Sequence, residues 1–156
     1  MPELPDLTVF VENLDKRVTK KKIKSVRCGS NLRLNVSPMM LAESLQAQVV
    51  DTVERWGKEV RFLIGNGRVL YVHLMLTGGF VITGTPDKVP FPQLVIGFED
   101  DTSLVVTDEK AMAIAALDPE KPEASPDALA VTVDELKRLI SRFPKLRPRR
   151  FSSTRK

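Results

Sequence analysis

Residues 60–74 read VRFLIGNGRVLYVHL, in which two apolar runs flank a Gly-Asn-Gly turn. Val60, Phe62 and Ile64 stand at every second position, which is the spacing of a strand with one buried face. The Gly-Asn-Gly turn is a strong hairpin signal, because these residues adopt the positive φ angles that tight turns between strands need. The second run is rich in Val, Leu and Tyr. The stretch therefore predicts a β-hairpin in the middle of the chain.

Similar signals occur on both sides of this hairpin. Leu32, Leu34 and Val36 alternate with polar residues, as a half-buried strand would. Residues 99–101 are all acidic and indicate a turn, and residues 84–92 contain three prolines and a glycine, which indicates a loop. Four further runs have the composition of strands: Phe80–Thr83, Leu94–Phe98, Ser103–Thr107 and Met112–Leu117.

Three other segments have the signals of amphipathic helices. The first covers residues 3–18 and has apolar residues spaced by three and four: Leu4, Leu7, Phe10, Val11, Leu14 and Val18. The second has Ser37 as its N-cap, and Pro38 lies in its first turn. The third begins with Thr132 and Glu135, which match a capping box, and its apolar stripe comprises Val133, Leu136, Leu139, Ile140 and Phe143.

Together these elements predict an α+β fold that is mainly β. We expect a two-layer β-sandwich flanked by an N-terminal helix and a C-terminal helix. A chain of 156 residues is long enough for one domain with a core and short for two. We place this domain at residues 1–141, and residues 142–156 form a basic C-terminal tail.

Composition excludes several classes of protein. No run approaches the roughly 18 apolar residues that span a bilayer, and the acidic start of the chain is unlike a signal peptide. We therefore expect a cytoplasmic protein with no membrane partner. With one cysteine and one histidine, the chain has neither a disulfide framework nor a Cys/His zinc site, so no metal and no cofactor is predicted.

The basic residues are unevenly distributed. Seven lie between Lys16 and Arg27, and seven more lie between Arg142 and Lys156, with no acid in either stretch. Clustered cations favour a polyanion partner, because phosphate neutralisation releases counterions. The alternative is that both stretches are solvated surface.

Pro2 and Glu3 form a candidate catalytic pair at the start of the first helix. Removal of Met1 would expose a secondary amine at Pro2, and an α-amino group titrates at about 7.7–8.0. The positive end of the helix dipole would further disfavour the protonated amine. Such an amine can attack a sugar's anomeric carbon, and Glu3 could then serve as general acid or base. The alternative is that both residues merely favour helix initiation.

Three segments carry a resemblance to a known family. The opening Met-Pro-Glu-Leu-Pro-Asp-Leu is followed at the expected distances by Arg55-Trp56-Gly57-Lys58 and by His73-Leu74-Met75-Leu76-Thr77-Gly78. These segments resemble the N-terminal start, the Arg-x-x-Lys segment and the His-Leu-x-Met-x-Gly motif of the formamidopyrimidine-DNA glycosylase / endonuclease VIII family. Residues 104–113, with Asp108 near their centre, stand where that family has Asp-Pro-Arg-Arg-Phe-Gly. The resemblance covers nearly the whole chain.

The resemblance implies a bifunctional DNA glycosylase/AP lyase of base excision repair. Pro2 would be the nucleophile and Glu3 its acid/base partner on oxidised bases, followed by β- and δ-elimination. Lys58 and His73 would hold the phosphate backbone beside an extruded nucleotide. The implied partner is double-stranded DNA with damaged bases or abasic sites, in the nucleoid. Alternatively, Lys58 is an ordinary surface lysine and His73 a satisfied, half-buried histidine.

Further implied DNA contacts come from Met75, Leu76, Lys110 and Met112, and three of these depart from the family pattern. Leu76 replaces the methionine that fills the gap left by the flipped base, and its similar volume can preserve that function. Lys110 replaces an arginine facing the orphaned base, which removes a planar, multidentate donor. Met112 replaces a stacking phenylalanine and offers no aromatic face. Discrimination of the opposite base should therefore be weak or altered.

Beyond Pro148 the family continues into a helix–two-turn–helix module and a zinc finger, for which this sequence has no counterpart. Two alternatives to an active glycosylase follow. The chain is a catalytically impaired relative that binds damaged DNA, or it is one part of a split glycosylase whose separate partner supplies the missing half. All covalent chemistry also requires removal of Met1, because a retained methionine would leave the Pro2 nitrogen as an amide.

Overall fold

The computed structural model describes residues 3–120 and 132–142. The chain divides into two compact units, Met1–Glu123 and Ala124–Lys156. In the second unit, helix α3 (Val133–Arg142) begins directly after Thr132, as the capping-box pattern predicts. Phe143 and the tail from residue 143 onward lie outside the described residues, so the domain boundary after residue 141 stays a prediction.

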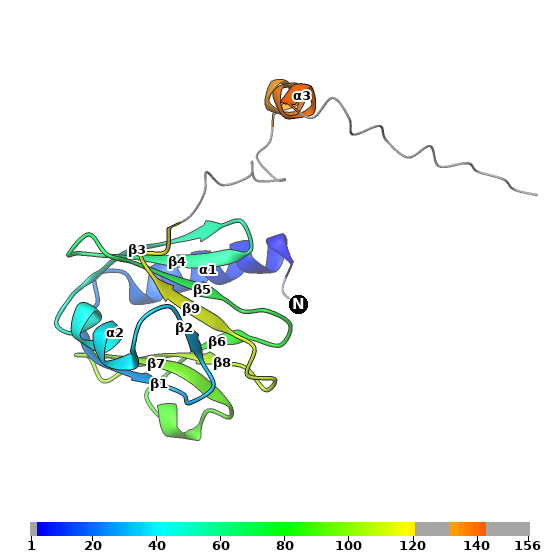
Figure 1. The fold of residues 1–156 in the computed structure, drawn as a ribbon. Coiled ribbons are helices and arrows are strands. Elements are labelled where there is room, and N and C mark those ends of the chain that lie inside the picture. Colours follow the sequence, from blue (N-terminus) through cyan, green and yellow to red (C-terminus); the bar gives the residue numbers. More distant parts are fainter. Residues whose placement is uncertain (1–2, 121–131, 143–156) are drawn as a thin grey trace, which may run out of the picture. The chain divides into compact units, whose positions relative to one another are not determined.

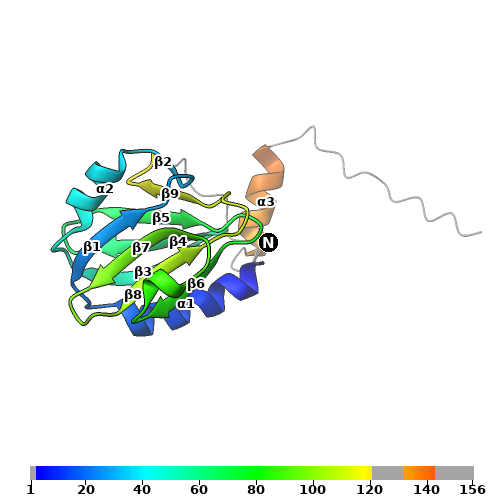
Figure 2. The same cartoon turned by 90° about the horizontal axis from the view of Figure 1, so that it is seen from below.

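The first unit contains two packed β-sheets (Figures 1 and 2). The antiparallel four-stranded sheet has the order β1 (Ile23–Cys28), β7 (Pro92–Phe98), β8 (Ser103–Thr107), β6 (Gly79–Thr83). The five-stranded sheet has the order β2 (Arg33–Leu34), β9 (Ile114–Leu117), β5 (Val69–His73), β4 (Glu59–Ile64), β3 (Val50–Trp56). Its pairs are antiparallel except for β2 with β9. The α+β, mainly β prediction is confirmed.

Alternating side chains of both sheets form one core. In β4 every second residue is buried, with Phe62 1% exposed, and Phe98 of β7 is equally buried. Helix α1 (Leu4–Val18) packs against edge strand β3, and its Phe10 meets Phe80 of edge strand β6 edge-to-face at 6.2 Å. Helix α2 (Pro38–Leu45) packs against β1 at another edge. The helices of the first unit thus cover sheet edges that would otherwise be open to other chains.

The central hairpin forms as predicted. Strands β4 and β5 are joined by a tight turn in which the Ile64 N–H donates to the Arg68 carbonyl at 2.9 Å. Gly67 has a φ of +82°, a conformation that costs a residue with a Cβ atom free energy. The three predicted helices and the strand at residues 103–107 are also confirmed.

Two strands were not predicted, and two predicted runs are shorter than expected. Strand β3 carries a β-bulge between Val50 and Thr52, so its buried residues are Val50 and Val53 and the two-residue period is lost. Half of the residues of strand β1 are charged or polar, and only Ile23 is fully buried. The run at residues 32–36 forms only the two-residue strand β2, and the run at 112–117 begins at Ile114. The loop at residues 84–92 includes a 3₁₀ turn, η1 (Pro86–Lys88).

The first basic stretch is partly neutralised within the protein, which reduces the positive charge that it offers to a polyanion. Four of its cations form ion pairs: Lys21–Asp100 (2.6 Å), Lys22–Glu99 (2.9 Å), Lys24–Asp101 (3.1 Å) and Arg27–Asp87 (2.9 Å). The hydrogen bond from Lys21 is the largest contribution that lowers the pKa of Asp100, to about 2. Within the described residues, each helix is too short or too polar to cross a lipid bilayer.

Asp15 fastens α1 to β3. Its carboxylate accepts hydrogen bonds from the Val53 backbone N–H (2.8 Å) and from the hydroxyls of Thr19 (2.7 Å) and Thr52 (3.1 Å). The Val53 hydrogen bond is the main cause that lowers the pKa of Asp15. The charged form is therefore favoured in the folded state, and protonation weakens the attachment.

We expect Asp15→Asn to lower the free energy of unfolding by about 1–3 kcal/mol at pH 7, because a neutral amide oxygen accepts the three bonds more weakly than a charged carboxylate oxygen. The pKa of Asp15 is lower in the folded state, so this contribution is present above the unfolded pKa and is lost as pH falls through the folded pKa. Urea unfolding at pH 7 and in acid measures both effects. The control is Glu12→Gln, an exposed position on the same helix. Equal effects of the two variants would contradict the assignment.

Candidate active site and nucleic-acid interface

Glu3 caps the start of α1. Its backbone N–H donates to the Asp6 carboxylate at 2.9 Å, and its carbonyl accepts from the Leu7 N–H at 3.0 Å. The Glu3 side chain is exposed at the positive end of the helix dipole. Pro2 lies outside the described residues, so its role stays a prediction.

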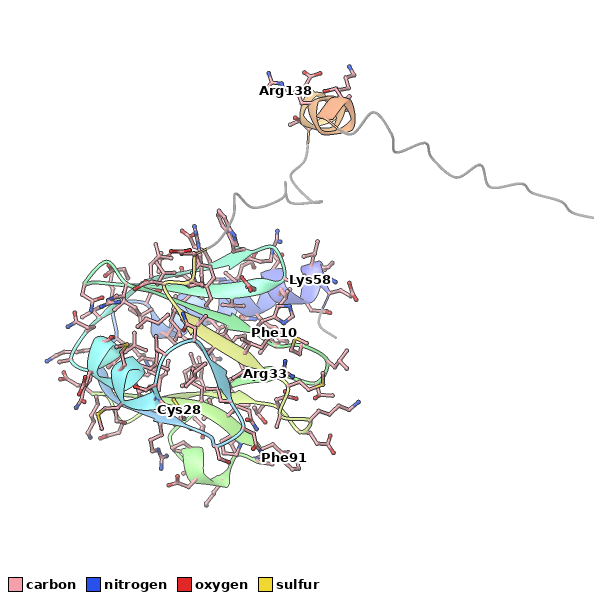
Figure 3. All side chains as sticks on the ribbon, viewed as in Figure 1. Phe10, Cys28, Arg33, Lys58, Phe91 and Arg138 are labelled. Atoms are coloured by element: carbon pink, nitrogen blue, oxygen red, sulfur yellow. The ribbon has the colours of Figure 1, made fainter. Side chains whose placement is uncertain are left out.

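Lys58 lies at the tip of the β3–β4 hairpin and is exposed (Figure 3). Helix α1 runs antiparallel to β3, because Lys20 bonds to Val50 at one end and Asp15 bonds to Val53 further along. From Val53 to its last residue, Trp56, strand β3 advances about 10 Å, and from Asp15 back to Leu4 helix α1 covers about 16 Å. The antiparallel packing therefore places the β3–β4 tip, with Lys58, at the end of the sandwich where α1 begins.

His73 is the last residue of β5 and is half-buried. Its Nδ1 accepts a hydrogen bond from the Met75 backbone N–H at 3.0 Å. An accepting Nδ1 places the proton of a neutral imidazole on Nε2, so the ring presents a donor from Nε2. The hydrogen bond also fixes the orientation of the ring. Both alternatives for His73, a donor to phosphate and a satisfied histidine, are compatible with this hydrogen bond.

The loop at residues 74–78 presents Leu76. Leu74 is 1% exposed and anchors the loop, whereas Leu76 is 45% exposed. The loop closes through a hydrogen bond from the Gly78 N–H to the Leu74 carbonyl at 3.0 Å. Met75, with a φ of +55°, is half-buried at the turn. An apolar side chain on a closed, anchored loop has the properties of a wedge.

The loop at residues 108–113 is organised by Asp108, which is 1% exposed. Its carboxylate accepts from the backbone N–H groups of Lys110 (3.2 Å), Met112 (2.6 Å) and Ala113 (2.7 Å). It also accepts from the Thr77 hydroxyl in the neighbouring loop. Lys110 is exposed and Met112 is half-buried. Burial by itself raises the pKa of Asp108, but these four hydrogen bonds outweigh it and lower the pKa.

All these segments lie at one end of the sandwich, the end where α1 begins (Figures 1 and 2). Strand pairing explains why: Trp56 pairs with Glu59, Val60 with Val72, and His73 with Ile114. The β3–β4 tip, the end of β5 and the start of β9 therefore lie next to one another at the same end of the five-stranded sheet. The sequence-predicted residues from Glu3 to Met112 are separated by up to 109 positions, and the fold gathers them at this end.

From the sequence, Asp108 was noted only as a residue that matches the family's Asp-Pro-Arg-Arg-Phe-Gly segment, and Thr77 had no assigned role. The sequence signal for this role of Asp108 was weak, because an aspartate after a strand is also an ordinary turn residue. A carboxylate followed by small or flexible residues, with a threonine in the preceding motif, was the only indication.

Gly78 permits the tight loop. A Cβ atom at Gly78 would collide with the Leu74 backbone, coming within 2.9 Å of its Cα, whereas a Cβ atom at Gly84 would meet nothing within 4 Å. We expect Gly78→Ala to destabilise the fold by about 1–3 kcal/mol and to displace Leu76. Gly84→Ala should be neutral or slightly stabilising. Thermal unfolding of both variants measures this difference, and equal melting temperatures would contradict the prediction.

Comparison with known proteins identifies the family of this chain. Residues 1–114 match the model of the formamidopyrimidine-DNA glycosylase N-terminal domain. The chain belongs to this family. The formamidopyrimidine-DNA glycosylase of Protochlamydia amoebophila is 33% identical over 107 residues, which cover 67% of this chain and 39% of that protein. The Mycoplasma genitalium protein of the same name is 31% identical over 102 residues, 65% of this chain and 36% of that protein.

Solved glycosylase structures share the fold of this family member. The Lactococcus lactis protein bound to DNA containing FAPY-dG superposes with a TM-score of 0.67 and 20% identity over 90% of this chain, which covers 48% of that chain. The same protein with abasic-site DNA gives the same values. This family member thus spans less than half the length of its solved and curated relatives described here.

Proposed function

We propose that this chain is the catalytic domain of a bifunctional DNA glycosylase/AP lyase that acts on oxidised bases in double-stranded DNA. The observation that carries the proposal is the gathering of Glu3, Lys58, His73 and Leu76 at the end of the sandwich where α1 begins. Membership of the glycosylase family supports it. A protein of this kind would work in the cytoplasm, at the nucleoid.

The chemistry follows from an amine at the start of a helix. With Met1 removed, the Pro2 nitrogen attacks C1′ of the damaged nucleotide, a C1′–N bond to the protein forms, and the bond from C1′ to the base breaks. The proton that the Pro2 nitrogen loses goes to the departing base. Glu3 donates a proton to the sugar's ring oxygen, and the opened sugar is held as an iminium. Successive β- and δ-elimination then expel the 3′ and 5′ phosphates, and water releases the sugar remnant from Pro2.

The other residues of this end hold and open the duplex. Lys58 and the Nε2–H of His73 donate to phosphate oxygens on either side of the extruded nucleotide. Leu76 fills the space that the nucleotide leaves. Lys110 and Met112 face the opposite strand, where a lysine gives less directional recognition than an arginine. We therefore infer broad tolerance of the base opposite the lesion.

Reductive trapping tests this function. The protein, with loss of Met1 verified by intact mass, is incubated with sodium borohydride and either abasic-site or undamaged duplex. We expect a covalent protein–DNA adduct with the abasic duplex only, because borohydride reduces an iminium to a stable amine. Absence of the adduct from protein that lacks Met1 would overturn the catalytic proposal.

A non-catalytic role in binding damaged DNA is the second candidate. It is favoured by Lys110 and Met112, which depart from the family pattern. It predicts salt-sensitive binding that Pro2→Gly and Glu3→Gln leave unchanged, and no trapped adduct. In a split glycosylase, a separate partner carrying the remaining half would restore trapping when it is added.

A further inference from the structure

Asp108 connects two loops that carry different parts of the proposed DNA interface. Three of the hydrogen bonds to its carboxylate come from its own loop, and the fourth comes from Thr77, two residues before β6 and next to Leu76. Removing the Thr77 hydroxyl would break the carboxylate's bond between the loops and leave the three bonds within residues 108–113 in place.

The backbone of Asp108 is fixed as well. Its N–H donates to the Phe91 carbonyl at 3.0 Å, and its own carbonyl accepts from the buried Gln93 side chain at 3.2 Å. Asp108 is thereby anchored to the start of β7, which belongs to the sandwich core. A buried carboxylate is stabilised only when its oxygens are hydrogen-bonded. A change in either loop that breaks one of these bonds therefore destabilises the carboxylate of Asp108.

We propose that Asp108 is a positioning residue that couples the loop of Leu76 to the loop of Lys110 and Met112, so that both loops enter a damaged duplex as one unit. This inference rests on the proposed function, because it requires that these loops engage DNA. Asp108 is 1% exposed and acts through its neighbours. The residues of the two loops that face DNA are Leu76, which fills the space left by the extruded nucleotide, and Lys110, which faces the opposite strand.

Thr77→Val provides the test, and Thr77→Ser is its matched control. Valine has nearly the shape of threonine but lacks the hydroxyl, whereas serine keeps the hydroxyl. We expect Thr77→Val to reduce the ratio of affinities for abasic and undamaged duplex about tenfold, the equivalent of one hydrogen bond to a charged group. Thr77→Ser should restore most of the ratio. A role in stability alone would lower the melting temperature but leave this ratio unchanged.

A double-mutant cycle measures the coupling itself. In the parent protein, the effects of Leu76→Ala and Lys110→Ala on abasic-site affinity should be non-additive, because the two loops move together. In the Thr77→Val background the same two effects should become additive. Asp108→Asn should go further and weaken both loops, because an amide cannot replace the four accepted bonds.

Hydrogen exchange in the free protein helps to distinguish a failure of the loop coupling from a failure of the proposed function. We expect Thr77→Val to speed exchange of the Met112 and Ala113 amides, although the substitution lies in the other loop. Unchanged exchange and an unchanged affinity ratio, in a protein that distinguishes abasic from undamaged duplex, would overturn the coupling alone. A protein that binds both duplexes equally would overturn the proposed function, and this inference with it.

Discussion

The Pro2→Leu variant should form no trapped adduct with abasic-site DNA. A bulky residue at position 2 prevents removal of Met1, so the nitrogen at position 2 becomes an amide without a nucleophilic lone pair. Loss of a covalent nucleophile costs several orders of magnitude in rate, and we expect a decrease of at least about 1,000-fold. The measurement is the yield of borohydride adduct against time, with intact mass confirming the state of the N-terminus.

Pro2→Gly is the matched control for this variant. Glycine also allows removal of Met1, so a free amine remains at the same position, and we expect trapping to be weaker but measurable. The hydrogen bond at the start of α1 joins the Glu3 backbone N–H to the Asp6 carboxylate, so it does not involve the side chain at position 2. Equal trapping by Pro2→Leu and the parent protein would show that another amine attacks the sugar.

The Glu3→Gln variant should lose base excision by about 100-fold to 10,000-fold, the contribution of a positioned general acid. Glutamine has the same size but carries no transferable proton at neutral pH. The fold should be unaffected, because the exposed Glu3 side chain is replaced by one of the same shape and Asp6 still accepts from the backbone N–H. Excision of an oxidised base, followed by gel electrophoresis under single-turnover conditions, measures the rate.

Glu12→Gln controls for the loss of one negative charge from the same helix, since Glu12 is also exposed. We expect Glu12→Gln to excise at close to the parent rate. Affinity for abasic duplex should be similar in both variants, because the substitution at position 3 changes a proton donor and leaves the phosphate contacts in place. A Glu3→Gln variant with the parent excision rate would assign the proton transfer to another group.

The fold was predictable where local chemistry and tertiary packing agree. The Gly-Asn-Gly turn, the N-cap at Ser37 and the alternation of β4 are all local signals that the structure confirms. Strand β3 was missed because its bulge moves the buried residues to Val50 and Val53, a spacing that imitates a helix. Such a bulge is decided by the partner strand, which no single-sequence pattern reports.

The candidate site was predictable as a set of residues and unpredictable as an arrangement. The family resemblance named Lys58 and His73, but their place at one end of the sandwich follows from the strand pairings, and the packing of α1 on β3 brings the start of α1 to the same end. The basic stretch at residues 16–27 indicated a polyanion site, whereas the acidic β7–β8 turn pairs with three of its lysines. Each of these relations joins residues distant in sequence, so composition and spacing carry no trace of them.

The covalent chemistry requires one nitrogen atom, that of Pro2, and peptide mapping of the borohydride adduct tests this assignment directly. The trapped complex is digested with nuclease and trypsin, and the residue that carries the reduced sugar remnant is located by mass spectrometry. We expect the modification on the Pro2 nitrogen, in the peptide Pro2–Lys16. A remnant on the Lys58 side chain or on any other lysine would contradict the assignment of Pro2 as the nucleophile.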